Sequence, residues 1–351
     1  MADNLRIPES TLDAFLREVF VRLKTPPETA ALAARSLMDA SLMGIDTHGV
    51  EALDMYFEHL RQGGLDPRPT PELLREKGGL GLWDMRHGIG LSGARTIMAH
   101  AVARAREYGT YLAVCRRTNH LGACGVYAKM AADEGLIAQV SQQTRSLFAP
   151  PGGVEPRVGA SPVAFAAPVA GGFPFLFDVT LAVMTHAQIK AHLRAGTPLP
   201  PGVALDKDGR PTLDPKAAWE GQVLPIGAHK GFGLAASFEV LHAVLSGNVL
   251  SGEIPSIVST PAKSAGTSIF MLVIDPDALG TKGDFARRMA EYVAYIESSP
   301  ARAAAAPPRY PGRRAGITWT ERKARGIPIR PDAFERIDRI AKVVQIAPLP
   351  R

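Results

Sequence analysis

The feature of this sequence that most constrains its fold is an alternation of helix-like and strand-like segments through the middle of the chain. Apolar residues at helical spacing predict helices over SGARTIMAHAVARAREYG, GVYAKMAADEG and THAQIKAHLRAG. Short apolar runs typical of strands lie between them and after them, in YLAVCRRT, LIAQVSQQ, VAFAAP, FPFLFDV and TSIFMLVIDP. Helical patterns also fill the N-terminal part of the chain, and FERIDRIAKVVQ closes it. The alternation therefore predicts a mixed α/β protein with helical ends.

A glycine-rich stretch inside this region raises the question of a dinucleotide-binding loop. Gly88, Gly90 and Gly93 in HGIGLSGARTIMAHA have the G-x-G-x-x-G spacing. A Rossmann unit also requires a buried strand just before the glycines and an acidic residue about 20 positions later. The preceding GLGLWDMRH is short and interrupted by charges, and the following TYLAVCRRTNH ends in Arg116 and Arg117. An arginine pair could bind a 2′-phosphate, so the motif alone leaves the Rossmann interpretation open.

Composition argues against several classes of function. The start, MADNLRIPES, has no signal-peptide pattern, and the longest apolar stretch is broken by prolines, so we expect neither export nor a membrane span. With Cys115 and Cys124 as the only cysteines, a reducing, cytoplasmic location is expected. Together with His120 they form C-x4-H-x3-C, which lacks a fourth ligand, and no metal site is expected. The net charge of +6 comes from dispersed arginines without interleaved aromatic residues, which favours small anions over nucleic acid.

Three histidines lie beside glycine in predicted loops. They are His48 in IDTHGV, His120 in TNHLGACG and His229 in IGAHKGFG. Asp178 comes at the end of the apolar FPFLF strand, and the carboxyl ends of strands are where α/β folds place their ligands. Four other histidines within helical patterns are interpreted as surface or partly buried residues: His59, His100, His192 and His242.

Several motifs along the chain carry a resemblance to a known family. They are GIDTHGV, NHLGACGVYAKMAADEGLIA, APPGGVEPRVGASPVAFAAP, FDVTLA, GVALDKDGRPTLDP, LPIGAHKGFGLAASFEVLHAVLSG and the late PG-containing loop before GIPI. The chain resembles the malate/L-lactate dehydrogenase family of the sulfolactate and ureidoglycolate dehydrogenase type, which includes diketogulonate and cyclic ketimine reductases. The resemblance covers nearly the whole chain, with the motifs in family order.

The resemblance implies a non-Rossmann, mixed-sheet fold that binds NAD or NADP, and a homodimer. The GIGLSG glycines are then a turn at the start of a helix. Lys230, in a glycine-rich loop that enters a helix, is independently plausible as part of an anion cradle. The cofactor-binding residues implied are His120, Leu121, Gly122, Ala123, Cys124, Ser141, Asp178, Val179, Thr180, His229, Lys230, Pro311, Gly312 and Arg313.

The same resemblance divides the chain into three parts. Residues 1–75 form a helical region on the substrate and dimer side, and residues 76–300 form the mixed α/β cofactor-binding domain. Residues 301–351 pack back on the N-terminal region.

The implied chemistry is hydride transfer between nicotinamide C4 and C2 of a 2-oxo acid or a related imine. The acceptor needs a proton as the hydride arrives, and histidine can donate one near neutral pH. His120 is our first choice for this role. His48 with Thr47 is the second, in a relay with Asp178 that orients the imidazole.

Departures from the family pattern concern the substrate side. An arginine commonly follows the S-H-G motif, and this chain has Ala52 there. The segment DVTLA stands where the family commonly has D-M-A-T-S. His186 and Gln188 stand where the family commonly has a basic pair soon after it. Ordinary malate or lactate specificity is therefore not expected. A substrate carboxylate still needs a cation, and we expect Arg145 to supply it, with Thr144 and His48 as further substrate contacts.

Three functions compete on this basis. The first is an NAD(P)-dependent oxidoreductase of an acidic small molecule, a 2-oxo or 2-hydroxy acid. The second is a cyclic ketimine reductase. The third is a catalytically silent binding protein on the same fold, which Ala52 and the altered DVTLA segment support.

Overall fold

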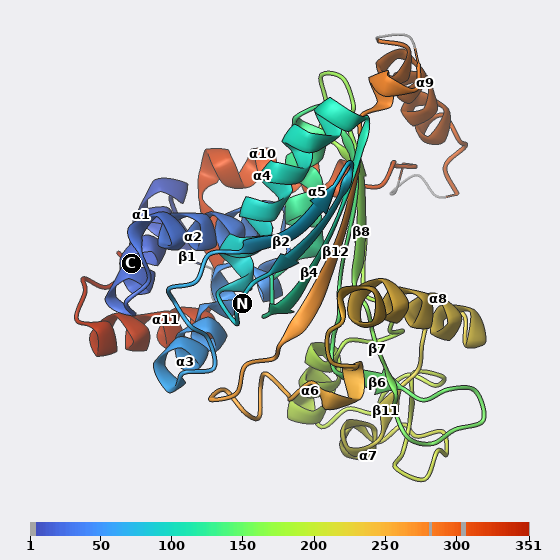
Figure 1. The fold of residues 1–351 in the computed structure, drawn as a ribbon. Coiled ribbons are helices and arrows are strands. Elements are labelled where there is room, and N and C mark those ends of the chain that lie inside the picture. Colours follow the sequence, from blue (N-terminus) through green and yellow to red (C-terminus); the bar gives the residue numbers. More distant parts are fainter. Residues whose placement is uncertain (1–4, 281–282, 303–306, 351) are drawn as a thin grey trace.

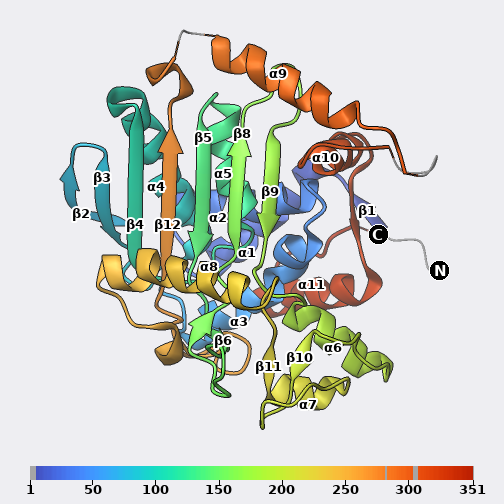
Figure 2. The same ribbon diagram turned by 90° about the vertical axis from the view of Figure 1, so that its right-hand side faces the viewer.

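A computed structural model describes residues 5–280, 283–302 and 307–350. Within these residues the largest sheet has seven strands in the order β2-β3-β4-β12-β5-β8-β9, seen face-on in Figure 2. The strands are β2 (Glu72–Lys77), β3 (Leu80–Asp84), β4 (Thr110–Thr118), β12 (Thr267–Ile274), β5 (Ile137–Gln142), β8 (Val163–Ala167) and β9 (Phe175–Val179).

The sheet is mixed and almost entirely antiparallel. Only β3 and β4 pair in parallel among the described strands, and β12 enters late in the sequence between β4 and β5. A doubly wound dinucleotide-binding fold would instead have a mostly parallel sheet. The predicted mixed-sheet α/β class is thus confirmed.

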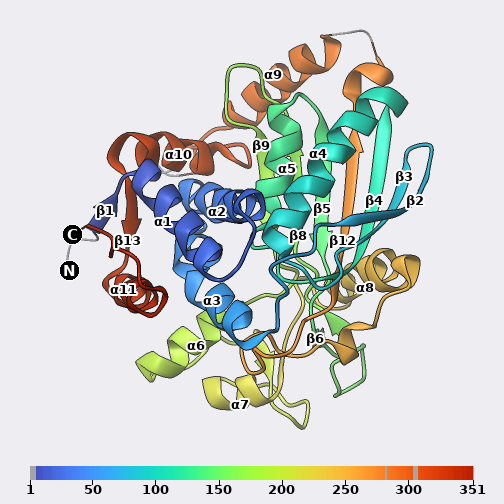
Figure 3. The same cartoon turned by 60° about the vertical axis from the view of Figure 1, so that its left-hand side comes forward.

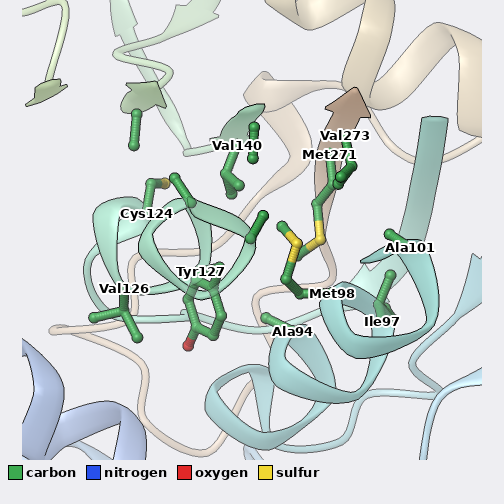
Figure 4. Close-up of a cluster of buried hydrophobic side chains, with 14 of the residues drawn as sticks. Ala94, Ile97, Met98, Ala101, Cys124, Val126, Tyr127, Val140, Met271 and Val273 are labelled. Carbon is green, nitrogen blue, oxygen red and sulfur yellow. The ribbon is translucent and has the colours of Figure 1, made fainter. Parts of the chain in front are cut away.

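Helices cover both faces of the sheet because successive strand residues point to opposite sides. On β12, Met271 packs toward α4 (Gly90–Tyr108) and α5 (Cys124–Asp133), whereas its neighbour Phe270 packs toward α8 (His229–Glu239). Figure 4 shows Met271, Met98 and Tyr127 in the first of these layers. In Figure 1, α8 lies across the opposite side of the sheet. The His120 loop joins β4 to α5. Both elements belong to this packed core, so the loop is anchored at its two ends.

The two ends of the chain meet in a helical layer beside α4 and α5 (Figure 3). β1 (Leu5–Ile7) pairs antiparallel with β13 (Ile327–Ile329), and one buried apolar cluster joins the first and last helices. The helices of this layer are α1 (Glu9–Arg22), α2 (Pro27–Leu42), α3 (Leu53–Gln62), α10 (Arg313–Arg325) and α11 (Pro331–Val344). Two short 3₁₀ turns, η1 (Asp46–His48) and η2 (Val50–Ala52), connect α2 to α3.

A small lobe lies below one end of the sheet (Figure 2) and has its own apolar cluster. It contains α6 (His186–Ala195), α7 (Pro215–Glu220), β10 (Ala204–Leu205) and β11 (Gln222–Val223). The pair β6 (Ser146–Phe148) and β7 (Val158–Gly159) joins this lobe to the sheet, and helix α9 (Asp284–Glu297) packs on the other end of the sheet through its own apolar cluster. This lobe and the 3₁₀ turn η4 (Ser251–Glu253) flank the end of the sheet where β5 finishes.

The predicted helices and strands of the middle region are present. The GIGLSG turn does begin a helix, since α4 starts at Gly90. The described elements that were not expected from the sequence include the hairpin β2–β3, α9, α10 and β13. The proline-containing segment ARAAAAPPRYPGRR lies partly outside the described residues and ends in the first turn of α10.

Candidate functional site

His120 lies in the loop that leaves β4 and enters α5, and two donors converge on one of its ring nitrogens. The Tyr56 hydroxyl on α3 is 2.6 Å from His120 Nδ1, and the backbone N–H of Gly122 donates to the same atom at 3.3 Å. Gly122 has φ +80°, which lets the chain fold back under the ring. A backbone N–H can only donate, so Nδ1 is the unprotonated nitrogen of the neutral ring. His120 therefore carries its proton on Nε2.

The loop that carries His120 is anchored by Gln142 at the end of β5. The Gln142 side-chain oxygen accepts a hydrogen bond from Leu121 N–H (3.3 Å), and its amide donates to the Asn119 carbonyl (2.8 Å). Both residues that flank His120 are thus tied to the sheet. Gln142 thus anchors the loop to β5, and Tyr56 contacts the His120 ring itself.

His48 stacks on His120, with ring centroids 5.5 Å apart and 23° between the planes. The Thr47 hydroxyl lies 3.1 Å from His48 Nδ1. Burial lowers the pKa of His48, and burial, with a smaller effect of the neighbouring imidazoles of His48 and His59, lowers the pKa of His120 to about 3. Both imidazoles are neutral at physiological pH in the absence of a ligand. The structure therefore brings together Thr47, His48 and His120, as predicted, and adds Tyr56.

Asp178, at the end of β9, lies against the first turn of α5. Its carboxylate accepts a hydrogen bond from the backbone N–H of Gly125 (2.8 Å), and burial raises its pKa to about 6. A Cβ on Gly125 would lie 2.8 Å from the carboxylate oxygen, so the close approach depends on glycine. Among the described contacts, Asp178 bonds to this helix terminus and to neither imidazole. The predicted relay with His48 is not formed in this structure.

The segments proposed to hold the cofactor gather along β9 and its continuation. The Ile226 N–H donates to the Leu181 carbonyl (2.8 Å), which joins the loop before α8 to the residues that follow Asp178. At the other end of the strand, the Leu176 N–H donates to the Pro311 carbonyl (2.9 Å). Lys230 is exposed in the first turn of α8. Edge strand β9 thus brings together three regions that are distant in the sequence.

The polar groups of this region fit a nicotinamide dinucleotide. The Ser161 hydroxyl is buried beside the Asp178–Thr180 segment and has no hydrogen-bond partner in the described part of the chain. The raised pKa of Asp178 leaves a protonated fraction that can donate to an amide oxygen. Ser141, in contrast, is fully buried and donates to the Pro162 carbonyl (2.8 Å), which gives it a structural role.

The glycines of the G-x-G-x-x-G stretch serve packing. A Cβ on Gly90 would lie 2.2 Å from the Asn119 carbonyl oxygen, and one on Gly93 would lie 2.2 Å from the Met85 sulfur. Arg116 and Arg117, considered above as a 2′-phosphate site, both pair with the buried carboxylate of Asp84 (3.0 and 2.6 Å). The Rossmann interpretation is therefore wrong, and its arginines are already engaged.

A cavity of about 250 Å³ opens beside His120. Arg145, which follows β5, is half-buried in its wall, and burial lowers the pKa of the guanidinium. Thr144 also lines it, but its hydroxyl accepts from Ala160 N–H (2.9 Å) and donates to the Arg145 carbonyl (3.2 Å). The other residues that line the cavity are Gln142, Gln143, Leu147, Trp219, Ile254, Pro255, Ser256, Ile257, Val258, Ala265 and Thr267.

Two departures from the family pattern have local structural explanations. Ala52 packs against the cluster of the N-terminal helices, and its neighbour Glu51 pairs with Arg330 (2.8 Å). Gln188 forms a capping box with Thr185 at the start of α6, where each side chain bonds the other's backbone N–H. Neither position supplies a cation.

Some site residues were missed by the sequence analysis. Tyr56 lies on the apolar face of α3, where a tyrosine has the pattern of an ordinary core residue, and Trp219 comes from the remote lobe. The interpretation of His59 and His242 as surface or partly buried residues is wrong, since both are buried. His59 donates from Nε2 to the Ile257 carbonyl at 2.5 Å and so holds one wall of the cavity.

The described part of the chain contains neither a metal centre nor a membrane-spanning helix. Within residues 5–280, 283–302 and 307–350, no cluster of three or more histidine, cysteine or acidic side chains could hold a metal ion. No helix in the same ranges has the length and hydropathy to cross a membrane.

Comparison with known proteins gives consistent matches over nearly the whole chain. A family model described as malate/L-lactate dehydrogenase matches residues 7–338. A malate dehydrogenase from Pyrococcus abyssi is 31% identical over 97% of this chain and 96% of the relative. A Delta(1)-pyrroline-2-carboxylate/Delta(1)-piperideine-2-carboxylate reductase from Pseudomonas putida is also 31% identical, over 92% and 96%.

Solved structures give the same result. The sulfolactate dehydrogenase from Methanocaldococcus jannaschii matches with a TM-score of 0.89 and 26% identity, covering 97% of this chain and 98% of the other. The delta1-piperideine-2-carboxylate reductase from Pseudomonas syringae matches with a TM-score of 0.88 and 29% identity, covering 96% and 100%.

Proposed function

The chain belongs to the malate/L-lactate dehydrogenase family, and from that premise we propose which residues perform its reaction. It is an NAD(P)-dependent oxidoreductase that acts at C2 of a 2-oxo or 2-hydroxy acid. The observation that carries the assignment of the site is the convergence of Tyr56 and Gly122 on His120 Nδ1. The cavity beside His120 is the substrate site in this proposal.

In the direction of reduction, His120 is the proton donor. Bound NAD(P)H supplies the hydride that C2 receives. Since Nδ1 is occupied by two donors, Nε2–H is the edge that His120 offers to the substrate carbonyl oxygen. This hydrogen bond stabilises the negative charge that develops on the oxygen.

The protonation state of His120 depends on the substrate. Burial lowers the pKa of His120 to about 3 in the free protein, so the ring is neutral. An anionic substrate beside the ring favours the charged form and raises that pKa. The Tyr56 hydroxyl can then turn to accept from Nδ1–H of the charged ring, which passes its Nε2 proton to the substrate oxygen and returns to the neutral form. His48, stacked on the other side with Thr47, is the second group that can relay a proton to His120.

Arg145 binds the substrate carboxylate in this proposal, because its half-buried guanidinium lines the same cavity as His120. Thr144 shapes the loop, with its hydroxyl bonded to the backbone. The proposed cofactor contacts are the residues implied by the family resemblance, except Ser141, whose hydroxyl donates to the Pro162 carbonyl. They are His120–Cys124, Asp178–Thr180, His229, Lys230 and Pro311–Arg313.

A cyclic ketimine substrate fits the His120 geometry less well. A protonated ketimine carries its own N–H, which would face the Nε2–H donor of His120, whereas a carbonyl oxygen accepts from it. A catalytically silent protein would not need the arrangement of two histidines and a tyrosine around an open cavity. We also propose that the protein is a cytoplasmic homodimer. In this proposal its chain consists of the three parts described above, with boundaries after residues 75 and 300.

The test of this assignment compares His120→Ala with Arg145→Ala. We expect His120→Ala to lower the turnover of a 2-oxo acid by roughly 10²–10⁴-fold with cofactor affinity nearly unchanged. Arg145→Ala should mainly raise KM, since it removes a charged partner of the carboxylate. The readouts are steady-state loss of NAD(P)H absorbance and cofactor titration by fluorescence.

The matched control is Arg157→Ala, an exposed arginine on a nearby loop that pairs only with Glu155 among its described contacts. Wild-type turnover in His120→Ala would transfer the donor role to His48. Unchanged KM in Arg145→Ala would remove that residue from the site.

A further inference from the structure

The cavity beside His120 is lined by a group of apolar side chains as well as by Arg145. This apolar wall comes from three parts of the chain: β6, the small lobe and the segment after η4. It consists of Leu147, Trp219, Ile254, Pro255, Ile257 and Val258. These side chains form an apolar surface and carry no charge.

The neutral polar side chains of the cavity are used by the protein itself. Gln142 bonds Asn119, Leu121 and Thr267, and the Gln143 amide donates to Glu239 (3.2 Å) and to the Val249 carbonyl (2.9 Å). The Ser256 hydroxyl accepts from Ser259 N–H (3.2 Å). A ligand therefore meets His120, Arg145 and an apolar remainder.

The charge available to a ligand is small. Among the described residues that line the cavity, Arg145 is the one side chain with a permanent positive charge. A dicarboxylate, or a carboxylate with a sulfonate, would place a second negative charge against the apolar wall. An unpaired charge moved out of water costs several kcal/mol, so such a substrate is disfavoured.

The apolar wall is held in place. His59 donates to the Ile257 carbonyl, and Ile254 is buried at the base of the same segment. Trp219 lines the cavity from α7, which is capped by Asp214. These contacts fix the base of the Ile254–Val258 segment.

We propose that the substrate carries one negative charge and a branched or aromatic apolar side chain. This inference rests on the proposed function and narrows its substrate class. The carboxylate lies at Arg145, the 2-oxo oxygen at His120 Nε2–H, and the side chain against Trp219 and the Ile254–Val258 segment. Reduction consumes one NAD(P)H and one proton and yields the 2-hydroxy acid and NAD(P)⁺.

A substrate panel tests the proposal with the purified full chain. It contains 4-methyl-2-oxopentanoate, phenylpyruvate, pyruvate, oxaloacetate, 3-sulfopyruvate and Δ1-piperideine-2-carboxylate, each with NADH and with NADPH. We expect kcat/KM for the first two to exceed the values for oxaloacetate and 3-sulfopyruvate by roughly 10-fold or more. Preference for either dianion, or for the cyclic imine, would overturn the inference while the oxidoreductase assignment stands. No turnover of any 2-oxo acid would overturn both.

Two variants test whether the apolar wall causes the expected substrate preference. Trp219→Ala should lower kcat/KM for phenylpyruvate by roughly 10-fold or more, with a smaller effect on pyruvate, because pyruvate does not reach the wall. Val258→Arg adds a cation at the rim and should raise kcat/KM for oxaloacetate by about 2- to 5-fold. The control Val343→Arg, equally exposed on α11, should leave oxaloacetate unchanged. Equal losses for phenylpyruvate and pyruvate in Trp219→Ala would contradict the proposed placement.

Discussion

At the scale of single residues, three ionisable groups of the site have pKa values displaced by burial. The pKa of His120 falls to about 3, that of His48 falls, and that of Asp178 rises to about 6. Each shift favours the neutral form, because burial disfavours charge. An incoming anion can therefore change the protonation of the two imidazoles. The sequence identified these residues by their loops, but the direction of each shift depends on packing partners such as Tyr56 that no local pattern reveals.

Asp178 gives a pH-dependent prediction for stability. Its folded-state pKa of about 6 exceeds the ordinary value near 4, so the folded protein binds more protons than the unfolded chain between these values. The free energy of unfolding should therefore fall as pH rises through this window. Asp178→Asn keeps an oxygen that can accept from Gly125 N–H and removes the charge.

We expect Asp178→Asn to raise Tm at pH 7 on the order of 2–4 °C and to leave it unchanged at pH 4, measured by differential scanning calorimetry. Asp208→Asn, on an exposed turn, is the control and should show no pH-dependent change. A gain of the same size at both pH values, or a lower Tm at pH 7, would contradict the account.

At the scale of elements, the sequence predicted the segments with strong periodicity and missed those without it. α10 is a very polar helix (RRAGITWTERKAR) whose exposed surface leaves little apolar pattern, and β13 is three residues long. The G-x-G-x-x-G spacing was a misleading signal, because glycine is required there by the close approach of α4 to the His120 loop. Spacing alone does not distinguish a glycine that approaches a ligand from one that approaches another segment of the chain.

The two glycine-rich regions give a paired prediction. Gly90→Ala should lower Tm by several degrees and reduce turnover, since its Cβ would displace the Asn119 and His120 carbonyls. Lys230→Ala should leave Tm unchanged and weaken cofactor binding, because an anion loses an attractive charge. Thermal melts and isothermal titration with NADH and NADPH separate the two effects.

Gly233→Ala is the control for the glycine, because its Cβ meets open space on α8. Lys342→Ala, an exposed lysine on α11, is the control for the charge. Loss of cofactor affinity in a folded Gly90→Ala variant, together with normal affinity in Lys230→Ala, would reverse the assignment of the two regions.

At the scale of the whole molecule, the site is assembled from parts that are far apart in the sequence. Tyr56 comes from the N-terminal helical layer, His120 from the sheet and Trp219 from the small lobe, and β9 joins the cofactor segments. The fold class and most of the proposed cofactor segments could be predicted because each has a local motif. The cavity wall could not, since its residues are ordinary apolar side chains that become a site only when the lobe and the sheet meet.

The central claim is that a hydride reaches C2 of a 2-oxo acid held beside His120. The direct measurement uses NADH and NADPH deuterated at C4 with the 2-oxo acids of the panel, and mass spectrometry of the 2-hydroxy acid formed. The account predicts one deuterium at C2 in the wild-type product and a rate lowered by roughly 10²–10⁴-fold in His120→Ala. Oxidation of the cofactor without deuterium at C2, or deuterium transfer at the wild-type rate in His120→Ala, would contradict it.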